Sequence, residues 1–85
     1  MSKIEREMAL LQVSAKSGQE RLEVLELARI FRARVVDVSP ITLTLEVMGQ
    51  REELDDLVQI LEPFGIGDIV RGATVAIERG SVVPD

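Results

Sequence analysis

The sequence predicts a small two-layer α+β domain, in which helices cover one side of a β-sheet. Strand-like and helix-like segments alternate along the 85 residues, and both helix-like segments carry an apolar stripe. Apolar residues make up 46% of the chain and aromatic residues only 2%, so the core must be aliphatic. A chain of this length forms one domain and buries roughly 60–65% of its unfolded surface, which leaves a small core.

In chain order, the first two elements are a strand and a helix. Residues Met8 to Ser14 alternate weakly between apolar and polar side chains, which is typical of a half-buried strand. Ser17 followed by Glu20 is a capping-box pattern, in which the hydroxyl accepts from an unpaired backbone N–H group while the carboxylate reaches back. A helix should therefore begin directly after Ser17.

That helix carries more apolar residues than one stripe requires. Its core stripe follows the i, i+3, i+4, i+7 pattern and consists of Val24, Leu27, Ala28 and Phe31. Leu22, Leu25 and Ile30 lie off this stripe. Two interpretations stay open: Leu25 and Ile30 line the edges of a wide stripe with Leu22 on the surface, or these residues contact another protein.

The central segments, Arg34 to Val38 and Leu43 to Met48, form a predicted hairpin. Both are rich in β-branched residues, and Ser39-Pro40 supplies the first two positions of a tight turn. Apolar and polar side chains alternate in the second strand, where one set is Leu43, Leu45 and Val47 and the other is Thr42, Thr44 and Glu46. This alternation predicts a helix layer on one side of the sheet only.

A second helix and a last strand complete the predicted fold. The helix runs from Gln50 to Leu61, has two acidic residues in its first turn, and ends before Pro63. The last strand extends from Asp68 to Glu78, with an interruption at Gly72.

The order strand, helix, strand, strand, helix, strand is that of ferredoxin-like domains. It predicts a single domain over residues 1–80, followed by a tail at 81–85. The four strands should form an antiparallel sheet in the spatial order 4-1-3-2, with both helices on one face. The opposite face is then left to water or to another chain.

No combination of side chains in the sequence supports catalysis. The chain has no His and no Cys, so it lacks the usual zinc ligands, a thiol nucleophile and a base that titrates near neutral pH. Its serines therefore have no imidazole partner, and Gly65-Ile66-Gly67 leads into a strand, unlike a nucleotide-binding loop. We expect a non-enzyme with no catalytic residues, no bound metal and no cofactor.

Charge and hydropathy exclude further classes of function. A net charge of -5 repels phosphate backbones, and the chain has no Trp or Tyr on which bases could stack. No segment approaches the roughly 20 apolar residues of a membrane span, and charged residues near Met1 interrupt any signal core. We expect a cytoplasmic protein that binds neither nucleic acid nor membranes.

Four segments carry a resemblance to a known family. In chain order they are Arg6–Val13, Ile30–Pro40, Leu43–Val47 and Pro63–Ile66. Together they resemble the C-terminal domain of the small, regulatory subunit of acetolactate synthase (acetohydroxyacid synthase), with a match from Glu5 to Gly80.

In that family, an N-terminal ACT domain that binds a feedback inhibitor precedes this domain. The small subunit associates with a catalytic subunit that uses thiamine diphosphate, magnesium and flavin. The resemblance therefore implies a regulatory role in branched-chain amino-acid biosynthesis, with the acetolactate synthase catalytic subunit as the partner that holds the cofactors.

Two functional hypotheses follow. The first is a regulatory domain that forms homo-oligomers and helps to control the catalytic subunit; its candidate contact residues are Leu22, Ile41, Phe64 and Ile66. The second is a stand-alone, ACT-like amino-acid-binding module, in which the loop after the first strand holds the ligand through Lys16 and Gly18. A purely structural dimerisation unit would differ from the first hypothesis only by lacking affinity for the catalytic subunit.

Overall fold

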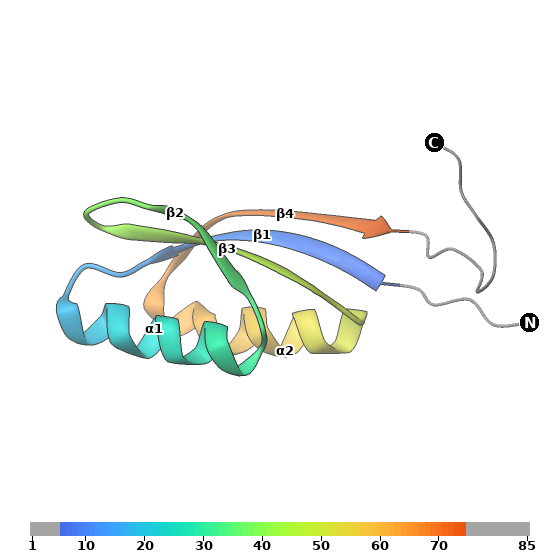
Figure 1. The fold of residues 1–85 in the computed structure, drawn as a ribbon, viewed down its shortest axis with the longest axis horizontal. Helices are drawn as coiled ribbons and strands as arrows, with labels where there is room; N and C mark the ends of the chain where they lie inside the picture. Colours follow the sequence, from blue (N-terminus) through green and yellow to red (C-terminus); the bar gives the residue numbers. More distant parts are fainter. Residues whose placement is uncertain (1–5, 75–85) are drawn as a thin grey trace, which may run out of the picture.

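A computed structural model describes residues 6–74, and Figure 1 shows its fold. The described elements are β1 (Arg6–Ser14), α1 (Gly18–Ile30), β2 (Arg34–Val38), β3 (Thr42–Gly49), α2 (Arg51–Leu61), a 3-10 turn η1 (Glu62–Phe64) and β4 (Ile66–Thr74). The predicted tail at 81–85 and the predicted end of the last strand lie outside the described residues.

The four strands form one antiparallel sheet in the order β2-β3-β1-β4. Both helices lie on the same side of this sheet (Figure 1). The predicted ferredoxin-like topology, with strand order 4-1-3-2 and a single helix layer, is confirmed. The described chain begins on β1 and ends on β4 at the same end of the sheet, because Arg6 pairs with Thr74.

The core lies between the sheet and the two helices and is entirely aliphatic. Its buried side chains come from α1, α2, β1, β3 and the loop after β1, and they are Ala9, Leu11, Val13, Ala15, Val24, Ala28, Leu43, Leu45, Val47, Leu54, Leu57 and Leu61. Each fully buried Leu or Val contributes roughly 1.5–3 kcal/mol. No polar or charged side chain of the described residues is buried, so burial alone accounts for this layer.

The predicted stripe of α1 packs as expected. Val24 and Ala28 are buried, and Leu27 and Phe31 are partly buried against the core. The capping pattern also forms at the N-terminus of α1, but its carboxylate reaches one residue further back than the usual box. The Ser17 hydroxyl accepts from the backbone N–H of Glu20 at 3.0 Å, and the Glu20 carboxylate accepts from the N–H of Lys16 at 3.0 Å.

The expected interruption of the last strand at Gly72 is wrong. β4 is continuous from Ile66 to Thr74, and Gly72 pairs with Met8. The register shift lies nearer the start of the strand, opposite the step from Leu11 to Val13. Gly72 keeps its place in the ladder because strand pairing uses backbone groups, so the missing side chain affects only the surface of the sheet.

The connection into β4 depends on the backbone of Gly65. Its φ is +99°, a conformation that side chains with a Cβ rarely adopt, and a Cβ there would lie 3.2 Å from the Ser14 hydroxyl oxygen. The carbonyl of Gly65 also accepts from the N–H of Ser14 at 2.8 Å. This residue therefore joins the end of β1 to the start of β4.

We predict that Gly65→Ala lowers the free energy of unfolding by about 1–3 kcal/mol, because alanine is strained at positive φ and crowds Ser14. Urea unfolding followed by circular dichroism measures the change. Gly18→Ala is the matched control, since a Cβ at Gly18 meets no atom within 4 Å and the residue begins α1. Equal stability of the two variants would contradict this account of Gly65.

Candidate functional site: interaction surfaces and an ion cluster

The structure places the four predicted contact residues in two settings. Leu22 is 65% exposed on α1, and Ile41 is 55% exposed in the turn between β2 and β3. Phe64 and Ile66 are partly buried because they pack against the core where α2 gives way to β4. Leu22 and Ile41 are thus available to a partner, whereas Phe64 and Ile66 also help to close the domain.

Backbone hydrogen bonds bring Ile41 and the start of β4 to one end of the sheet. The N–H of Ala15 donates to the carbonyl of Ile41 at 2.8 Å, and the N–H of Ser14 donates to Gly65 at 2.8 Å. The guanidinium of Arg21, the neighbour of Leu22, donates to the backbone carbonyl of the hairpin turn. Ile41 and the start of β4 therefore lie around the loop that follows β1, and Arg21 ties α1 to the hairpin turn next to Ile41.

The loop between β1 and α1 carries Lys16, whereas Gly18, predicted to lie in this loop, is the first residue of α1; both residues are exposed. The backbone N–H groups just before Lys16 donate within the chain, and that of Lys16 donates to the Glu20 carboxylate at 3.0 Å. The Ser17 hydroxyl accepts from the backbone of α1. An amino-acid carboxylate at this loop would face the Glu20 carboxylate.

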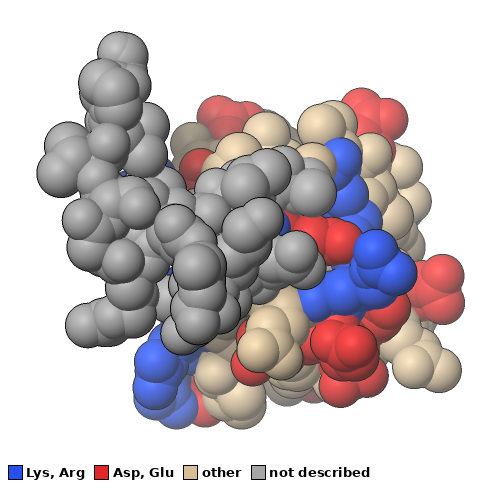
Figure 2. Space-filling model, turned by 90° about the vertical axis from the view of Figure 1, so that its right-hand side faces the viewer, with Lys and Arg blue, Asp and Glu red and all other residues tan. Residues whose placement is uncertain are grey.

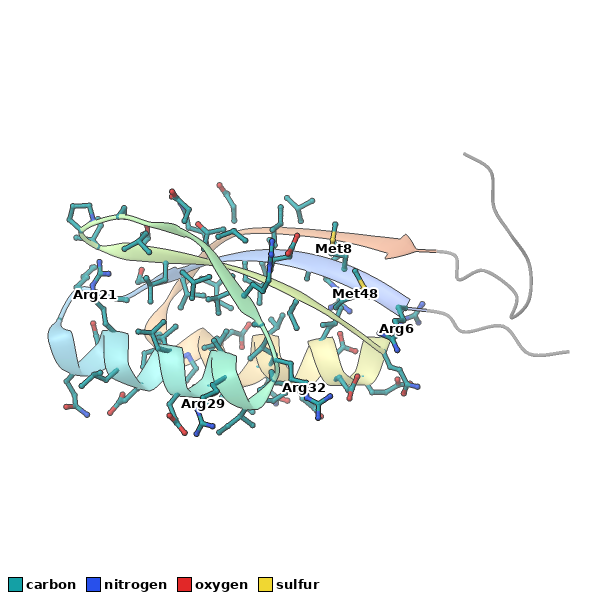
Figure 3. The ribbon with its side chains drawn as sticks, in the orientation of Figure 1. Arg6, Met8, Arg21, Arg29, Arg32 and Met48 are labelled. Carbon is teal, nitrogen blue, oxygen red and sulfur yellow. The ribbon has the colours of Figure 1, made fainter. Side chains whose placement is uncertain are left out.

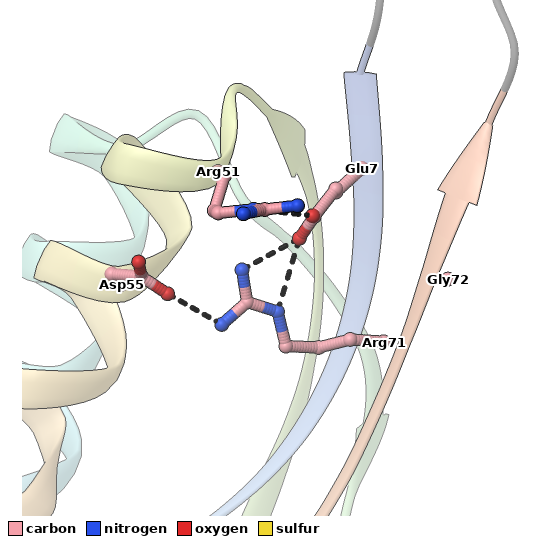
Figure 4. Close-up of a pocket in the computed structure, with 5 residues that line it drawn as sticks. All are labelled: Glu7, Arg51, Asp55, Arg71 and Gly72. Atoms are coloured by element: carbon pink, nitrogen blue, oxygen red, sulfur yellow. Dashed lines mark hydrogen bonds and ion pairs between the residues drawn. The ribbon is translucent and has the colours of Figure 1, made fainter.

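At the opposite end of the sheet, four charged residues form an ion cluster that links β1, α2 and β4 (Figure 4). The Arg71 guanidinium donates to the Glu7 carboxylate at 2.6 and 3.2 Å and to the Asp55 carboxylate at 2.7 Å. Arg51, at the start of α2, donates to the other oxygen of Glu7 at 3.3 Å. Together with Gly72, these residues line a shallow cavity of about 260 Å³.

The cluster is electrically balanced, with two guanidinium groups and two carboxylates. The side chains of Glu7 and Arg71 are only 19% and 28% exposed, so their attraction is less screened than that of an ordinary surface pair. Hydrogen bonds from Arg71 lower the pKa of Glu7, Arg51 adds to this effect, and burial opposes it. The hydrogen bonds to Asp55 and Glu7 raise the pKa of Arg71.

Because each charge is matched, the ion cluster holds elements together and offers no unpaired group for acid or base chemistry. Figure 2 shows basic and acidic side chains side by side on this end of the molecule. On sequence grounds, Asp55 belongs with Glu52, Glu53 and Asp56 to the acidic residues of the second helix, whose spacing predicts solvent-exposed surface acid. The spacing of Arg51 and Asp55 on one helix face is the local signal, but their link to Glu7 and Arg71 requires the folded sheet.

The face of the sheet opposite the helices carries a patch of apolar side chains. Met48 is 51% exposed and Val70 is 62% exposed, and two half-buried residues of β1 lie between them. Figure 3 shows Met8 on this side of the sheet, away from the helices. This group is called the open-face patch below and consists of Met8, Leu10, Met48 and Val70.

Strand pairing arranges the open-face patch in two rows. In the first row, Met8 lies between Met48 on β3 and Gly72 on β4. In the second row, Leu10 of β1 lies between Glu46 on β3 and Val70 on β4.

The row that contains Leu10 ends at Arg34 on β2, whose guanidinium donates to Glu46 at 3.0 Å. The open-face patch is thus bordered on one side by an ion pair.

Two further classes of site are absent from residues 6–74. This part of the chain holds no group of three or more acidic, His or Cys side chains that are placed to bind a metal ion. Neither α1 nor α2 has the length and apolar character to cross a membrane. The chemical features of the described residues are therefore surfaces and ion pairs.

Comparison with known proteins gives consistent matches. Residues 6–80 match the family described as "Small subunit of acetolactate synthase". The acetolactate synthase small subunit of Aquifex aeolicus is 45% identical over 76 residues, which cover 89% of this chain and 40% of the relative. That of Mycobacterium bovis is 46% identical over 77 residues, which cover 91% of this chain and 45% of the relative.

A solved structure of a small subunit also matches this chain. The crystal structure of the acetolactate synthase small subunit from Thermotoga maritima superposes with a TM-score of 0.73 at 28% sequence identity. The match covers 89% of this chain and 48% of that one. The chain thus spans about half the length of the relatives it matches.

We predict that Arg71→Met raises the pKa of Glu7 toward its ordinary value, because the hydrogen bonds that lower it are lost. Carboxyl titration by NMR measures this pKa. Arg34→Met is the matched control, since it removes a guanidinium that pairs with Glu46 and leaves the Glu7 pKa unchanged.

The same substitution should change how stability depends on pH. A carboxylate whose pKa is lowered by folding adds stability above its unfolded pKa and loses that contribution as the pH falls through its folded pKa. The stability difference between wild type and Arg71→Met should therefore be largest at neutral pH and shrink in acid. A difference that is constant with pH in urea unfolding would contradict the role given to Glu7.

Proposed function

Because the chain belongs to the family of the acetolactate synthase small subunit, we propose that it is a regulatory domain that acts by binding other proteins. The membership confirms the resemblance predicted from the four sequence segments. It also confirms the expectation of a non-enzyme, since the family is that of the small, regulatory subunit and not of the catalytic one.

The observation that best supports a protein-binding role is the amount of apolar surface outside the core. Apart from the open-face patch, Leu22 and Ile30 on α1 are 65% and 60% exposed, and Ile41 in the hairpin turn is 55% exposed. A domain of this size gains more than a large one from covering such residues, because its own core is small. We therefore propose that the domain self-associates.

The proposed partner is the catalytic subunit of acetolactate synthase, by way of the small-subunit relatives. In this proposal the domain contributes to feedback control of that subunit in branched-chain amino-acid biosynthesis, in the cytoplasm. The absence of His and Cys from the sequence fits a division in which the catalytic partner carries the cofactors.

The geometry of the loop after β1 favours this function over the ACT-like amino-acid-binding alternative. A bound amino acid presents a carboxylate, which needs free N–H donors or an unopposed cation. The Lys16 N–H is already occupied by the Glu20 carboxylate, which also sets a negative charge beside Lys16. The N–H groups of Ala15 and Lys16 are therefore occupied, and Glu20 would repel an incoming carboxylate.

We predict that the tagged 85-residue chain captures the acetolactate synthase catalytic subunit of its own organism. Leu22→Lys combined with Ile41→Lys should weaken capture at least tenfold, because two exposed apolar contacts are replaced by charges. Gln19→Lys combined with Gln59→Lys adds two lysines at exposed polar positions and serves as the control. Absence of capture by the wild-type chain would contradict the proposed partnership.

We further predict that isothermal titration of the chain with valine, leucine and isoleucine gives no binding heat, because the N–H groups of Ala15 and Lys16 are already paired and the Glu20 carboxylate lies beside the loop. Saturable binding that Lys16→Met abolishes would instead support the amino-acid-binding alternative. Glu20→Gln provides a second check, because it removes the carboxylate beside Lys16. This substitution should create affinity for an amino acid only if the rest of the loop can bind a carboxylate.

A further inference from the structure

We infer that the open face of the sheet is the surface through which two copies of this chain associate, face to face around a two-fold axis that runs along β1. The inference rests on the self-association proposed above and names its surface. It begins from the open-face patch, whose four apolar side chains lie on three neighbouring strands. Both described helices lie on the side of the sheet away from Met8 (Figure 3).

The first row of the patch combines a protruding side chain with a gap. Met48 is 51% exposed on β3, one strand away from Met8. Gly72 lies one strand away from Met8 on the other side, on β4, and a Cβ built there would meet no atom within 4 Å. The sheet surface is therefore raised at Met48 and hollow at Gly72, at equal strand distances from β1.

That arrangement is self-complementary. A two-fold axis along β1, in the plane between two stacked sheets, exchanges the positions of β3 and β4. It places Met48 of each copy over Gly72 of the other, and Met8 and Leu10 over their own equivalents. Methionine suits this role because its flexible side chain adapts to the shape of a gap. An isologous contact of this kind closes with two copies.

Charge does not oppose the contact, although the chain carries a net charge of -5. The same axis places Glu46 over Val70, so no carboxylate of these two rows faces its own equivalent. Arg34 already pairs with Glu46 within each copy at 3.0 Å. The Arg34–Glu46 pair then lies at the rim of the contact, where ion pairs are tolerated in water.

The size of the face sets the expected affinity. Four strands about 4.8 Å apart, which are five to nine residues long, present a flat footprint of roughly 400–500 Å². A stable interface buries about 800 Å² of accessible surface on each partner. Protruding side chains add to the flat footprint, so the face fits a small interface, and we expect a dimer with a dissociation constant in the micromolar range.

Two substitutions test the contact by opposite routes, with the dimer dissociation constant measured by analytical ultracentrifugation. Met48→Lys should raise it at least tenfold by placing a charge in the apolar centre. Gly72→Val should also raise it at least tenfold by filling the gap that receives Met48, yet it should leave the monomer folded and at least as stable, because its Cβ has open space and valine favours strands. Val38→Lys, at a 63% exposed strand position outside the patch, is the matched control and should leave the constant unchanged.

Cross-linking tests the position of the axis. The chain has no cysteine, so a single introduced thiol is unique. Met8→Cys should be linked into dimers by a short bis-maleimide, because the axis brings the two copies of this residue together across a sheet spacing of roughly 10 Å. Val38→Cys should remain monomeric under the same conditions. Efficient linking of Val38→Cys without linking of Met8→Cys would overturn the inference.

The outcomes separate this inference from the proposal on which it rests. A wild-type chain that is monomeric at high micromolar concentration overturns both the self-association and its surface. A wild-type dimer whose dissociation constant is unchanged by Met48→Lys and by Gly72→Val leaves the self-association in place and overturns the open-face assignment. Weakening by both substitutions, with no effect of Val38→Lys, supports it.

Discussion

One-sided burial is the constraint on which the rest of this structure depends. The apolar side chains of β1 and β3 that face the helices are almost fully buried against α1 and α2, and this aliphatic layer is the main source of stability. Both described helices lie on one side of the sheet, so no layer formed by residues 6–74 covers the other side. The other face of the sheet must therefore be stable in water or be covered by another molecule.

The two ends of the sheet are closed in different ways. At one end, backbone hydrogen bonds tie the loop after β1 to the hairpin and to Gly65, and half-buried Phe64 and Ile66 complete the core. At the other end, the ion cluster joins the start of α2 to the sheet. Ion pairs of this kind contribute modestly to stability, but their geometry specifies how the helix meets the strands.

These features suit a module that works through contact and carries no chemistry of its own. The ion cluster uses its charges internally, and the N–H groups of Ser14, Ala15 and Lys16 also donate within the chain. What the described residues leave available is apolar surface on α1, on the hairpin and on the open face. A small subunit that forms part of a larger assembly needs such surfaces more than it needs reactive groups.

Local patterns in the sequence were sufficient for the fold and the core. The alternation in β3 and the stripes of α1 and α2 identify the buried side chains, because a strand repeats every two residues and a helix every 3.6. The capping pattern at Ser17 places the start of α1, and the order of the elements restricts the topology to few choices. The four matching segments identify the family without any coordinates.

Only the tertiary structure determines which side chains lie next to one another on each surface. Glu7 and Arg71 are 64 residues apart, and only strand pairing brings them together. The same pairing sets Met48 and Gly72 on either side of Met8, and it keeps β4 continuous where the sequence predicted a break. Sequence periodicity reports which way a side chain points, whereas strand register, which depends on the whole sheet, determines which distant side chains become neighbours.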